Sequence, residues 1–482
     1  MTILRKSALL PILLSARTTT AYFTQVNNAH VEFAATGTID THTGDSTVET
    51  VDDRSSLQHT TASLWNALEG ALELQGDLGF AAPKIMGLFE EWVERFGKEY
   101  GSLEEKSGRM LVWLENHVLI ETHNSKKSSF TLGHNEFSDM THAEFRERMR
   151  LGEFETDLVM REGKEFKFLE FNEEEEENSA ITNSRLRGPA ESATERKLQS
   201  TTAATTTDEK DWHQKGLMGP IRNQGICGAC WAFSAIGSIE SAMAIDKYNK
   251  MTPAEQAEQM VSSTGGVKND LGLVIPLSEQ NLIDCDTLHE KGCKGGLMTT
   301  TFEEEEVKKG ICSEVDYPYL QTQGTCSGAL CTPVPGSIVK DHVDIVPRKN
   351  NALKEALKTK PVTAAMVATD PMFQFYKNGI YSVEGCGKVT KSTGQLECNM
   401  IYEGQDVCLP DINHGVLVVG YGKDDTVTSD VQTFFKVKNS WGDAWGEGGY
   451  FRLARYETDK TDPLDNWGEC AILTLLSYPV ME

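Results

Sequence analysis

The chain has 482 residues, with 46 basic against 72 acidic side chains and a formal net charge of −26. A field of that sign repels nucleic acid and anionic membranes, so neither is expected as a partner. The hydrophobic fraction of 39% is ordinary for a soluble globular protein, and the length predicts more than one segment. The acidic composition is explained most simply by solubility. A more specific explanation is an adaptation to an acidic lumen.

The only membrane-like stretch of the sequence lies at its start. Arg5 and Lys6 precede a short apolar run, 8–16, and small residues follow it. This pattern is typical of a signal peptide and the run is too short to cross a bilayer. Residues 1–21 are therefore predicted to be a signal peptide, no membrane span is expected, and the predicted destination is extracellular, lysosomal or vacuolar.

Three further zones precede the part that holds the cysteines. Residues 22–84 are polar and Thr-rich, and their composition suggests no function. Residues 149–207 include five consecutive glutamates and few bulky apolar side chains, which predicts a solvated linker. Residues 85–148 are predicted to be helical, because apolar side chains recur there at helix spacing. These are Met86, Phe89, Trp92, Val93 and Phe96.

All 11 cysteines lie in the last zone, residues 208–482, which has the size of one large domain or two small lobes. An odd number in a secreted chain leaves at least one thiol without an internal partner. The simplest arrangement of 11 cysteines is five disulfide bridges and one free reactive thiol.

Cys230 is the candidate for that free thiol. It follows a glycine-containing loop, Gln-Gly-Ile-Cys-Gly-Ala, and begins an apolar run that predicts a helix. The N-terminus of a helix favours an anion, so this position stabilises a thiolate. Cys227 and Cys230 also form a Cys-x-x-Cys, which suits a redox dithiol or half of a zinc site. A second ligand pair at matching spacing is not clear, and no metal site is predicted.

A nucleophilic thiolate needs a group that handles its proton and a group that orients this partner. His414 and Gly415 precede an apolar run, 416–420, that predicts a buried strand, and Asn439 follows another strand-like run, 434–437. His414 can act first as base and then as acid. Asn439 can hold the imidazole ring without adding charge.

The Cys-Gly-Ala-Cys-Trp stretch, together with His414 and Asn439, resembles the papain and cathepsin L family of cysteine peptidases. The resemblance implies that Cys230 is the nucleophile, His414 its ion-pair partner and Asn439 the orienting residue. Gln224 and the backbone N–H of Cys230 would form the oxyanion hole, and Trp441 would shield the His–Asn hydrogen bond. The implied activity is that of a cysteine endopeptidase that works through an acyl-enzyme, with no metal or organic cofactor.

The same resemblance implies an α+β fold class. The papain-like two-lobed fold has a helical lobe that carries Cys230 and a β-barrel-like lobe that carries His414, and a helical propeptide domain, 85–148, precedes it. His414 and Asn439 follow Cys230 by 184 and 209 residues, which is further than the family spacing. We therefore expect polar, loop-like insertions near 245–272 and 387–411.

The resemblance also implies disulfides and a substrate cleft. The implied bridges are Cys227–Cys293, Cys285–Cys326 and Cys386–Cys470; Cys312–Cys331 and Cys398–Cys408 are left as extra pairs, the last by elimination. The backbone of Gly295 and Gly296 would bond an extended substrate. The pocket for the second residue before the cut would be apolar and would prefer Leu, Phe or Val over Arg, unless its residues are merely core. The substrate-binding residues are Gly295, Gly296, Leu297, Met298, Ala365, Ile412, Asn413, Leu475 and Trp441.

A stripe of mixed side chains in the helical zone resembles the inhibitory propeptide of cathepsin L-like enzymes. It consists of Glu105, Arg109, Trp113, Asn116, Ile120 and Asn124, followed by Gly133, Asn135, Phe137 and Asp139. The resemblance implies a zymogen whose propeptide inhibits its own peptidase domain, a monomer, and protein or peptide substrates. Two alternatives stay open: a non-catalytic relative, and a ligase that passes the acyl group to an amine.

Overall fold

The computed structural model describes residues 82–151, 208–256, 272–286, 290–327, 331–387, 400–402, 405–407, 410–427, 430–456 and 466–482. The predicted signal peptide, nearly all of 22–84, nearly all of the predicted linker and the Cys398–Cys408 pair lie outside these residues. The chain divides into two units, 1–67 and 68–482, and all described residues belong to the second. Within the described ranges, no helix has both the length and the apolar character needed to cross a bilayer.

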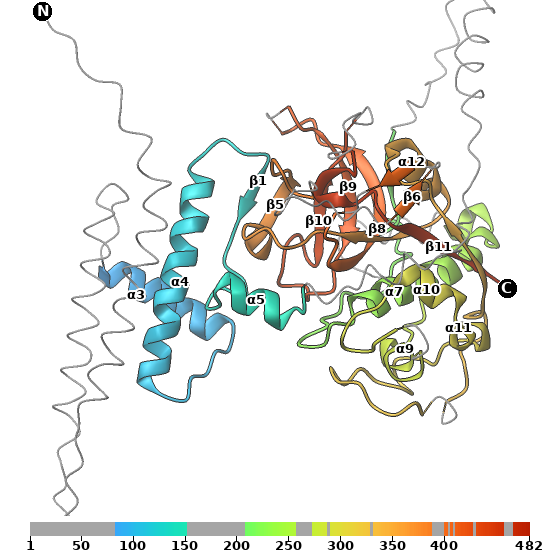
Figure 1. Ribbon diagram of the computed structural model, residues 1–482, viewed down its shortest axis with the longest axis horizontal. Helices are drawn as coiled ribbons and strands as arrows, with labels where there is room; N and C mark the ends of the chain where they lie inside the picture. Colours follow the sequence, from blue (N-terminus) through green and yellow to red (C-terminus); the bar gives the residue numbers. More distant parts are fainter. Residues whose placement is uncertain are drawn as a thin grey trace, which may run out of the picture. The chain divides into compact units, whose positions relative to one another are not determined.

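The propeptide zone contains the helices α3 (Ala82–Arg95), α4 (Leu103–Asn124) and α5 (His142–Arg148), with the short strand β1 (Phe130–Leu132) between α4 and α5 (Figure 1). The helical prediction is thus confirmed, and the predicted helical zone consists of separate helices joined by other segments. Ser102 caps α4, and Thr141 and Glu144 form a reciprocal capping box on α5.

The buried face of α3 includes a residue outside the apolar series that predicted the helix. Met86 is exposed, and the neighbouring Ile85 is buried instead, beside Phe89 and Trp92. Ile85, Phe89 and Trp92 follow spacings of four and three residues, which keep them on one face of the helix. Met86 lies one residue, or about 100°, off that face.

The helical lobe is built around α7 (Cys230–Asn249), with α9 (Glu279–Cys285), α10 (Met298–Glu303) and α11 (Glu305–Lys309) beside it in Figure 1. Nearly every residue of α7 is buried. The helix can be covered on all sides because many of its side chains are small, Ala, Ser or Gly, and allow close approach. Helix α7 contacts α9, α10 and the strand β8 (His414–Lys423).

The second lobe is formed by a mainly antiparallel sheet with strand order β1-β5-β10-β9-β8-β4-β11-β3, in which β2 pairs with β8. The contact between β10 and β5 is parallel. Helix α12 (Asn350–Thr359) packs against β8 and β4. Both runs that predicted strands around the candidate His and Asn form strands, β8 and β9. The remaining strands are β2 (Lys210–Asp211), β3 (Val339–Asp344), β4 (Val362–Met366), β5 (Tyr376–Tyr381), β9 (Thr433–Lys438), β10 (Tyr450–Ala454) and β11 (Leu476–Met481).

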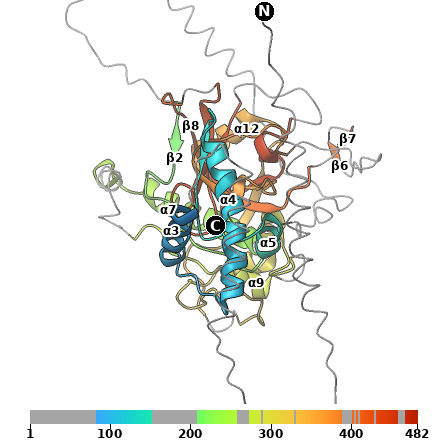
Figure 2. The ribbon, with the colours of Figure 1, turned by 90° about the vertical axis from the view of Figure 1, so that its left-hand side faces the viewer.

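The two expected insertions are not simply loops. Residues 400–407 hold a separate two-stranded sheet in which β6 (Met400–Tyr402) pairs with β7 (Gln405–Val407), visible at the edge of Figure 2. Helix α7 continues through Asn249, so the first residues of the 245–272 region are helical. Residues 257–271 lie outside the described part.

Four disulfides join Cys227–Cys293, Cys285–Cys326, Cys312–Cys331 and Cys386–Cys470. They agree with the pairs expected for these eight cysteines. Cys230 is a free thiol and is buried.

Candidate active site

Cys230 is the first residue of α7, at the junction of loop and helix that the sequence predicted. The N-cap residue, Ala229, supplies no side-chain hydrogen bond to the first turn. The backbone N–H groups of Gly415, Trp231 and Cys230 lower the pKa of the thiol, against the larger effect of its burial. The thiol therefore lies where backbone dipoles favour a negative charge.

His414 is the first residue of β8 and is fully buried. Its Nε2 lies 2.8 Å from Oδ1 of Asn439, which directly follows β9. The Trp441 ring covers this pair, with its centroid 4.8 Å from that of the imidazole. Nδ1 of His414 has no hydrogen-bond partner within the described residues, so it is the nitrogen available for a proton from another group.

Gly415 lets β8 lie directly against the start of α7. A Cβ at this position would lie 3.1 Å from Sδ of Met298 and 3.2 Å from the carbonyl carbon of Cys230. Glycine avoids both contacts. The backbone that follows His414 therefore lies directly against the first residues of α7.

The ionisation of the pair differs from the expected thiolate. Burial raises the pKa of the Cys230 thiol to about 11, and the backbone N–H donors lower it only in part. Burial also lowers the pKa of the His414 imidazole to about 4, against the opposing effect of the Asn439 hydrogen bond. Desolvation penalises both charged forms, so a neutral thiol beside a neutral imidazole is favoured in this covered state.

Gln224 is fully buried, and its side chain is oriented from both ends. Ser440 donates its hydroxyl to Oε1 at 2.7 Å, and Nε2 donates to the carbonyl of Cys227 at 3.1 Å. Tyr319 donates its hydroxyl to the Gln224 carbonyl at 2.6 Å. The amide N–H₂ group is thus held toward the loop that leads to Cys230, as an oxyanion donor requires.

The five apolar residues predicted for the substrate pocket come together. Leu297, Met298, Ala365 and Ile412 share one buried cluster, and the partly buried Leu475 packs against it. Leu475 accepts a hydrogen bond from the backbone of Ala365 at 3.1 Å. The residues thus gather from distant parts of the sequence, as a pocket lining must, although their burial also suits a core.

Gly295 and Gly296 lie beside this cluster, and each requires glycine for a different reason. Gly295 has φ +106°, a conformation that side chains disfavour. A Cβ on Gly296 would lie 2.7 Å from the Trp231 ring. Asn413 is buried, its side chain bonds to the backbone of Ala368 and Asp411, and its N–H donates to the Met366 carbonyl at 2.9 Å.

Sequence reasoning missed three residues next to these groups. Ser440 orients Gln224 and was visible in the sequence as the neighbour of Asn439; Tyr319 carried no such signal. Glu290 is also buried, and its carboxylate accepts from the N–H of Leu297 at 2.7 Å and from the hydroxyl of Thr300. An acidic group thus lies behind the pocket residues, with its charge committed to the backbone and a hydroxyl.

The propeptide zone contacts the second lobe around Gln374, in the 3-10 turn Phe373–Phe375. Strand β1 pairs antiparallel with β5, and Gly133 donates its N–H to the Phe375 carbonyl at 2.9 Å. Asn135 Nδ2 donates to the Gln374 carbonyl at 2.7 Å, and Gln374 Nε2 returns a bond to the Phe137 carbonyl at 3.1 Å. Inhibition therefore has a physical attachment that is built largely from backbone groups.

The propeptide also reaches the residues around Cys230. Asn223, the neighbour of Gln224, donates to Glu136 Oε1 at 3.2 Å, and Phe145 lies edge-on to Trp441 with ring centroids 5.2 Å apart. A Cβ on Gly228 would lie 2.9 Å from Cβ of Arg150. The end of this zone is thus close to the loop that precedes the nucleophile candidate.

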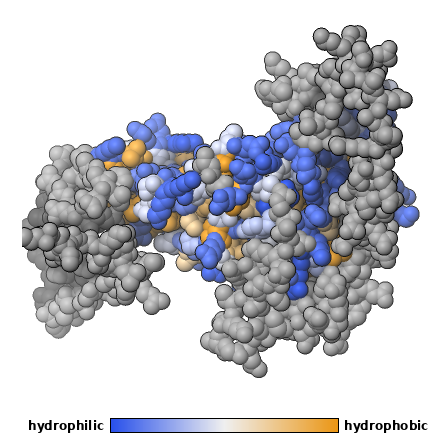
Figure 3. Space-filling view, turned by 90° about the horizontal axis from the view of Figure 1, so that it is seen from above, coloured by the Kyte–Doolittle hydropathy of each residue, from blue (hydrophilic) through white to orange (hydrophobic). Residues whose placement is uncertain are grey.

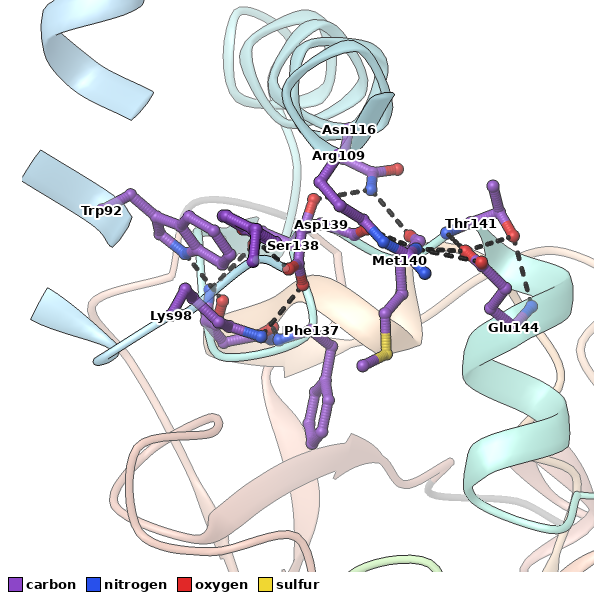
Figure 4. Close-up of polar contacts among 12 residues, drawn as sticks. Trp92, Lys98, Arg109, Asn116, Phe137, Ser138, Asp139, Met140, Thr141 and Glu144 are labelled. Carbon is purple, nitrogen blue, oxygen red and sulfur yellow. Dashed lines mark hydrogen bonds and ion pairs between the residues drawn. The ribbon is translucent and has the colours of Figure 1, made fainter. Parts of the chain in front are cut away.

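The predicted stripe on α4 explains how the contact segment keeps its shape (Figure 4). Asn116 Nδ2 donates to the carbonyls of Ser138 and Met140, each at 2.9 Å. Arg109 bonds to Glu144 at 2.9 Å and to the Asp139 carbonyl at 3.1 Å. Farther along the helix, Asn124 bonds both the N–H and the carbonyl of Leu132. The stripe therefore holds residues 132–144 against α4.

Two family descriptions match the chain: "Papain family cysteine protease" over residues 206–270 and 254–480, and "Cathepsin propeptide inhibitor domain (I29)" over residues 89–145. The chain belongs to the papain family of cysteine proteases. Cysteine protease XCP2 of Arabidopsis thaliana is 33% identical over 396 residues, which cover 82% of this chain and 86% of the relative. Cathepsin J of Mus musculus is 30% identical, with 82% and 92% covered.

Among solved structures, a recombinant stem bromelain precursor matches with a TM-score of 0.57 and 28% identity, over 83% of this chain and 99% of the other. The Amb a 11 cysteine protease of ragweed pollen, in its proform, matches with a TM-score of 0.55 and 26% identity, over 83% and 96%. The fold is therefore α+β and papain-like, with a propeptide. The chain is a cysteine endopeptidase made as a zymogen that its own propeptide inhibits.

Among the described residues, no group of three or more His, Cys, Asp or Glu side chains could hold a metal ion. Cys227 is used in a disulfide. The alternative reading of Cys227 and Cys230 as a redox dithiol or half of a zinc site therefore does not fit the structure.

Proposed function

We propose that Cys230 attacks the peptide carbonyl, that His414 takes and returns its proton, and that Asn439 orients the imidazole. The attack forms a bond from sulfur to carbon, the amine leaves with a proton from His414, and water then hydrolyses the acyl-enzyme. The observation that carries the proposal is the close approach of Gly415 to the backbone of Cys230, where a Cβ would lie 3.2 Å from the carbonyl carbon, while the adjacent His414 is fixed by Asn439 at 2.8 Å.

The neutral pair of the covered state becomes reactive by transfer of the thiol proton to Nδ1 of His414. Each resulting charge stabilises the other at short range, and this attraction opposes the desolvation that now favours the neutral forms. Removal of the propeptide, which touches Asn223 and Trp441, would also admit water to the site. In this proposal, Gln224 Nε2 and the backbone N–H of Cys230 receive the developing oxyanion.

The proposed substrates are proteins or peptides with an apolar residue, Leu, Phe or Val, two positions before the cut on its amino-terminal side. Support comes from the apolar cluster of Leu297, Met298, Ala365 and Ile412. The Glu290 carboxylate behind it accepts from Leu297 N–H and so is not offered to an arginine. A panel of fluorogenic peptides tests this pocket, and a preference for Arg over Leu would contradict it.

The proposed setting is a monomer in the secretory pathway, extracellular or in a lysosome or vacuole. The four disulfides support an oxidising compartment during folding. On the face shown in Figure 3, the described surface is mainly hydrophilic, with small separate hydrophobic areas. The proposed order of segments is a signal peptide (1–21), an extension (22–84), the propeptide (85–148), a linker (149–207) and the peptidase domain (208–482).

Labelling with an epoxide inhibitor tests the assignment. The acid-processed wild type should be labelled once, at Cys230, whereas Cys230→Ala should not be labelled and His414→Ala should react far more slowly. Labelling of Cys230→Ala, or a full rate in His414→Ala, would refute the proposal. Product analysis with added peptide amines separates hydrolysis from the ligase alternative, since a ligase would give amide products in place of free acids.

A further inference from the structure

Two histidines in the propeptide form a directly bonded, partly buried pair. His117, on α4, places Nδ1 at 3.0 Å from Nε2 of His134, which lies between β1 and α5. Both rings stack on the indole of Trp113, with centroid distances of 5.0 Å and 4.3 Å and interplanar angles of 9° and 7°. Trp113 and His117 are buried, and His134 is partly exposed. The two imidazoles thus lie side by side against one aromatic face.

The N···N contact is compatible with only some protonation states. One nitrogen must carry the hydrogen and the other must accept it. A second proton would place two N–H groups and two positive charges against each other at 3.0 Å, where the hydrogen bond is lost and like charges repel. The contact therefore has to break before both rings become charged.

His134 lies within the attachment of the propeptide to the peptidase domain. Its neighbours are Gly133, which donates to the Phe375 carbonyl at 2.9 Å, and Asn135, which donates to the Gln374 carbonyl at 2.7 Å. Separation of the rings that shifts the backbone of His134 pulls on residues that are bonded on both sides to the other domain. The pair is thus mechanically coupled to inhibition.

We propose that the His117–His134 pair is the acid-sensitive latch of this zymogen: protons that enter the pair separate the rings and release residues 133–135 from the peptidase domain. The inference rests on the proposed inhibitory role of this contact and adds the groups that regulate it.

The surroundings of both imidazoles disfavour their protonated forms in the closed state, as an acid-sensitive latch requires. Burial lowers the pKa of His134 from 6.5 to about 3, and the proximity of His117 adds to this effect. Burial also lowers the pKa of His117; exposed Lys84 of α3 opposes its protonation, and Glu121 of α4 favours it. The closed state thus holds fewer protons than the open state, so its stability is complete above pH 6.5 and is lost as the pH falls toward about 3. At about pH 4.5, a shift of this size weakens the closed state by about 100-fold.

The test uses the full chain with Cys230→Ala, which cannot process itself. Hydrogen exchange of the amides of residues 130–137, corrected for the intrinsic rate at each pH, reports opening between about pH 7 and pH 4. The parent chain should lose protection below about pH 6. The double variant His117→Leu, His134→Leu keeps apolar packing on Trp113 without a titrating group, and its loss of protection should move down by at least about one pH unit.

A second variant, His134→Gln, keeps a hydrogen-bonding side chain. Its opening pH should also move down, which shows that the shift does not come from altered packing in the leucine variant. The matched control is His142→Gln, which removes another propeptide imidazole that contacts the peptidase domain, at the Thr369 carbonyl. It should open at the parent pH. Opening of both pair variants at the parent pH, or a shift only in the control, overturns the latch.

Failure of the latch is distinguishable from failure of inhibition. In chains that retain Cys230, slow epoxide labelling at about pH 7 shows that the propeptide inhibits. Fast labelling there would refute inhibition itself. Slow labelling combined with an unchanged opening pH in the pair variants would refute the latch alone.

Discussion

Asn135→Ala should loosen the propeptide, because this side chain links the two domains and also supports its own loop. Nδ2 donates to the Gln374 carbonyl at 2.7 Å, and Oδ1 accepts from the buried N–H of Phe137 at 2.9 Å. The Gln374 carbonyl keeps a second donor, Nε1 of Trp445 at 3.2 Å, so it is not left unpaired. Loss of the bond between the domains then costs about 1 kcal/mol, and the unpaired N–H of Phe137 about 1–3 kcal/mol more.

A total of about 2 kcal/mol or more corresponds to a rise of about 30-fold or more in the open fraction, since 1.4 kcal/mol is tenfold. The assay is the rate of epoxide labelling of Cys230 in the full chain at about pH 7, where only open molecules react. The matched control is Thr131→Ala, which loses an exposed contact of 3.4 Å to Asn378 in the same β1–β5 pairing and should change the rate by less than about twofold. Labelling of Asn135→Ala at the wild-type rate, or equal acceleration in the control, would refute the reasoning.

Three further outcomes are expected. Gln224→Ala should lower kcat of the mature enzyme by about 100-fold or more per labelled site; a change confined to KM would exclude an oxyanion role. Gly415→Ala should lower kcat/KM by about 10-fold or more, because its Cβ would lie 3.2 Å from the backbone at the start of α7; Gly422→Ala, equally tight at 3.0 Å but against Phe434, is the control that should retain activity. Asp286→Asn should raise Tm at about pH 8 and leave it nearly unchanged at about pH 3.5. Burial raises the pKa of Asp286 from 3.8 to about 9, so the stability linked to its protonated form is lost as pH rises across that window. Calorimetry with the exposed Asp246→Asn as control checks the sign, and a gain confined to acid pH would contradict it.

Local patterns were enough to predict the parts of the site that depend on neighbours in the chain. The glycine loop and the apolar run after it placed Cys230 at the start of a helix, and the helix begins at that residue. The apolar run after His414 predicted a strand because a buried strand needs such side chains on both faces. The cysteine count predicted one free thiol, and Cys230 is free.

Local patterns failed where the partner of a residue mattered. Apolar spacing predicted a helix from residues that include Met86, but it did not show that the packing of α3 buries Ile85 and leaves Met86 exposed. Composition predicted a loop near 387–411, because it could not show that two short segments there pair as strands. The helix position of Cys230 favours a thiolate, and the local pattern did not show that burial in the assembled site opposes its ionisation.

The sequence alone thus predicted the candidate reacting groups and determined the elements that carry them, because helix starts, strands and cysteine parity are set by near neighbours. Only the tertiary structure decided how those groups are held and covered. Asn135 meets Gln374 across 239 residues of sequence, and His117 meets His134 between two separate elements. Such contacts depend on how elements pack in three dimensions. The spacing of apolar residues in the sequence predicts which side chains are buried, but it does not specify which residues bury them.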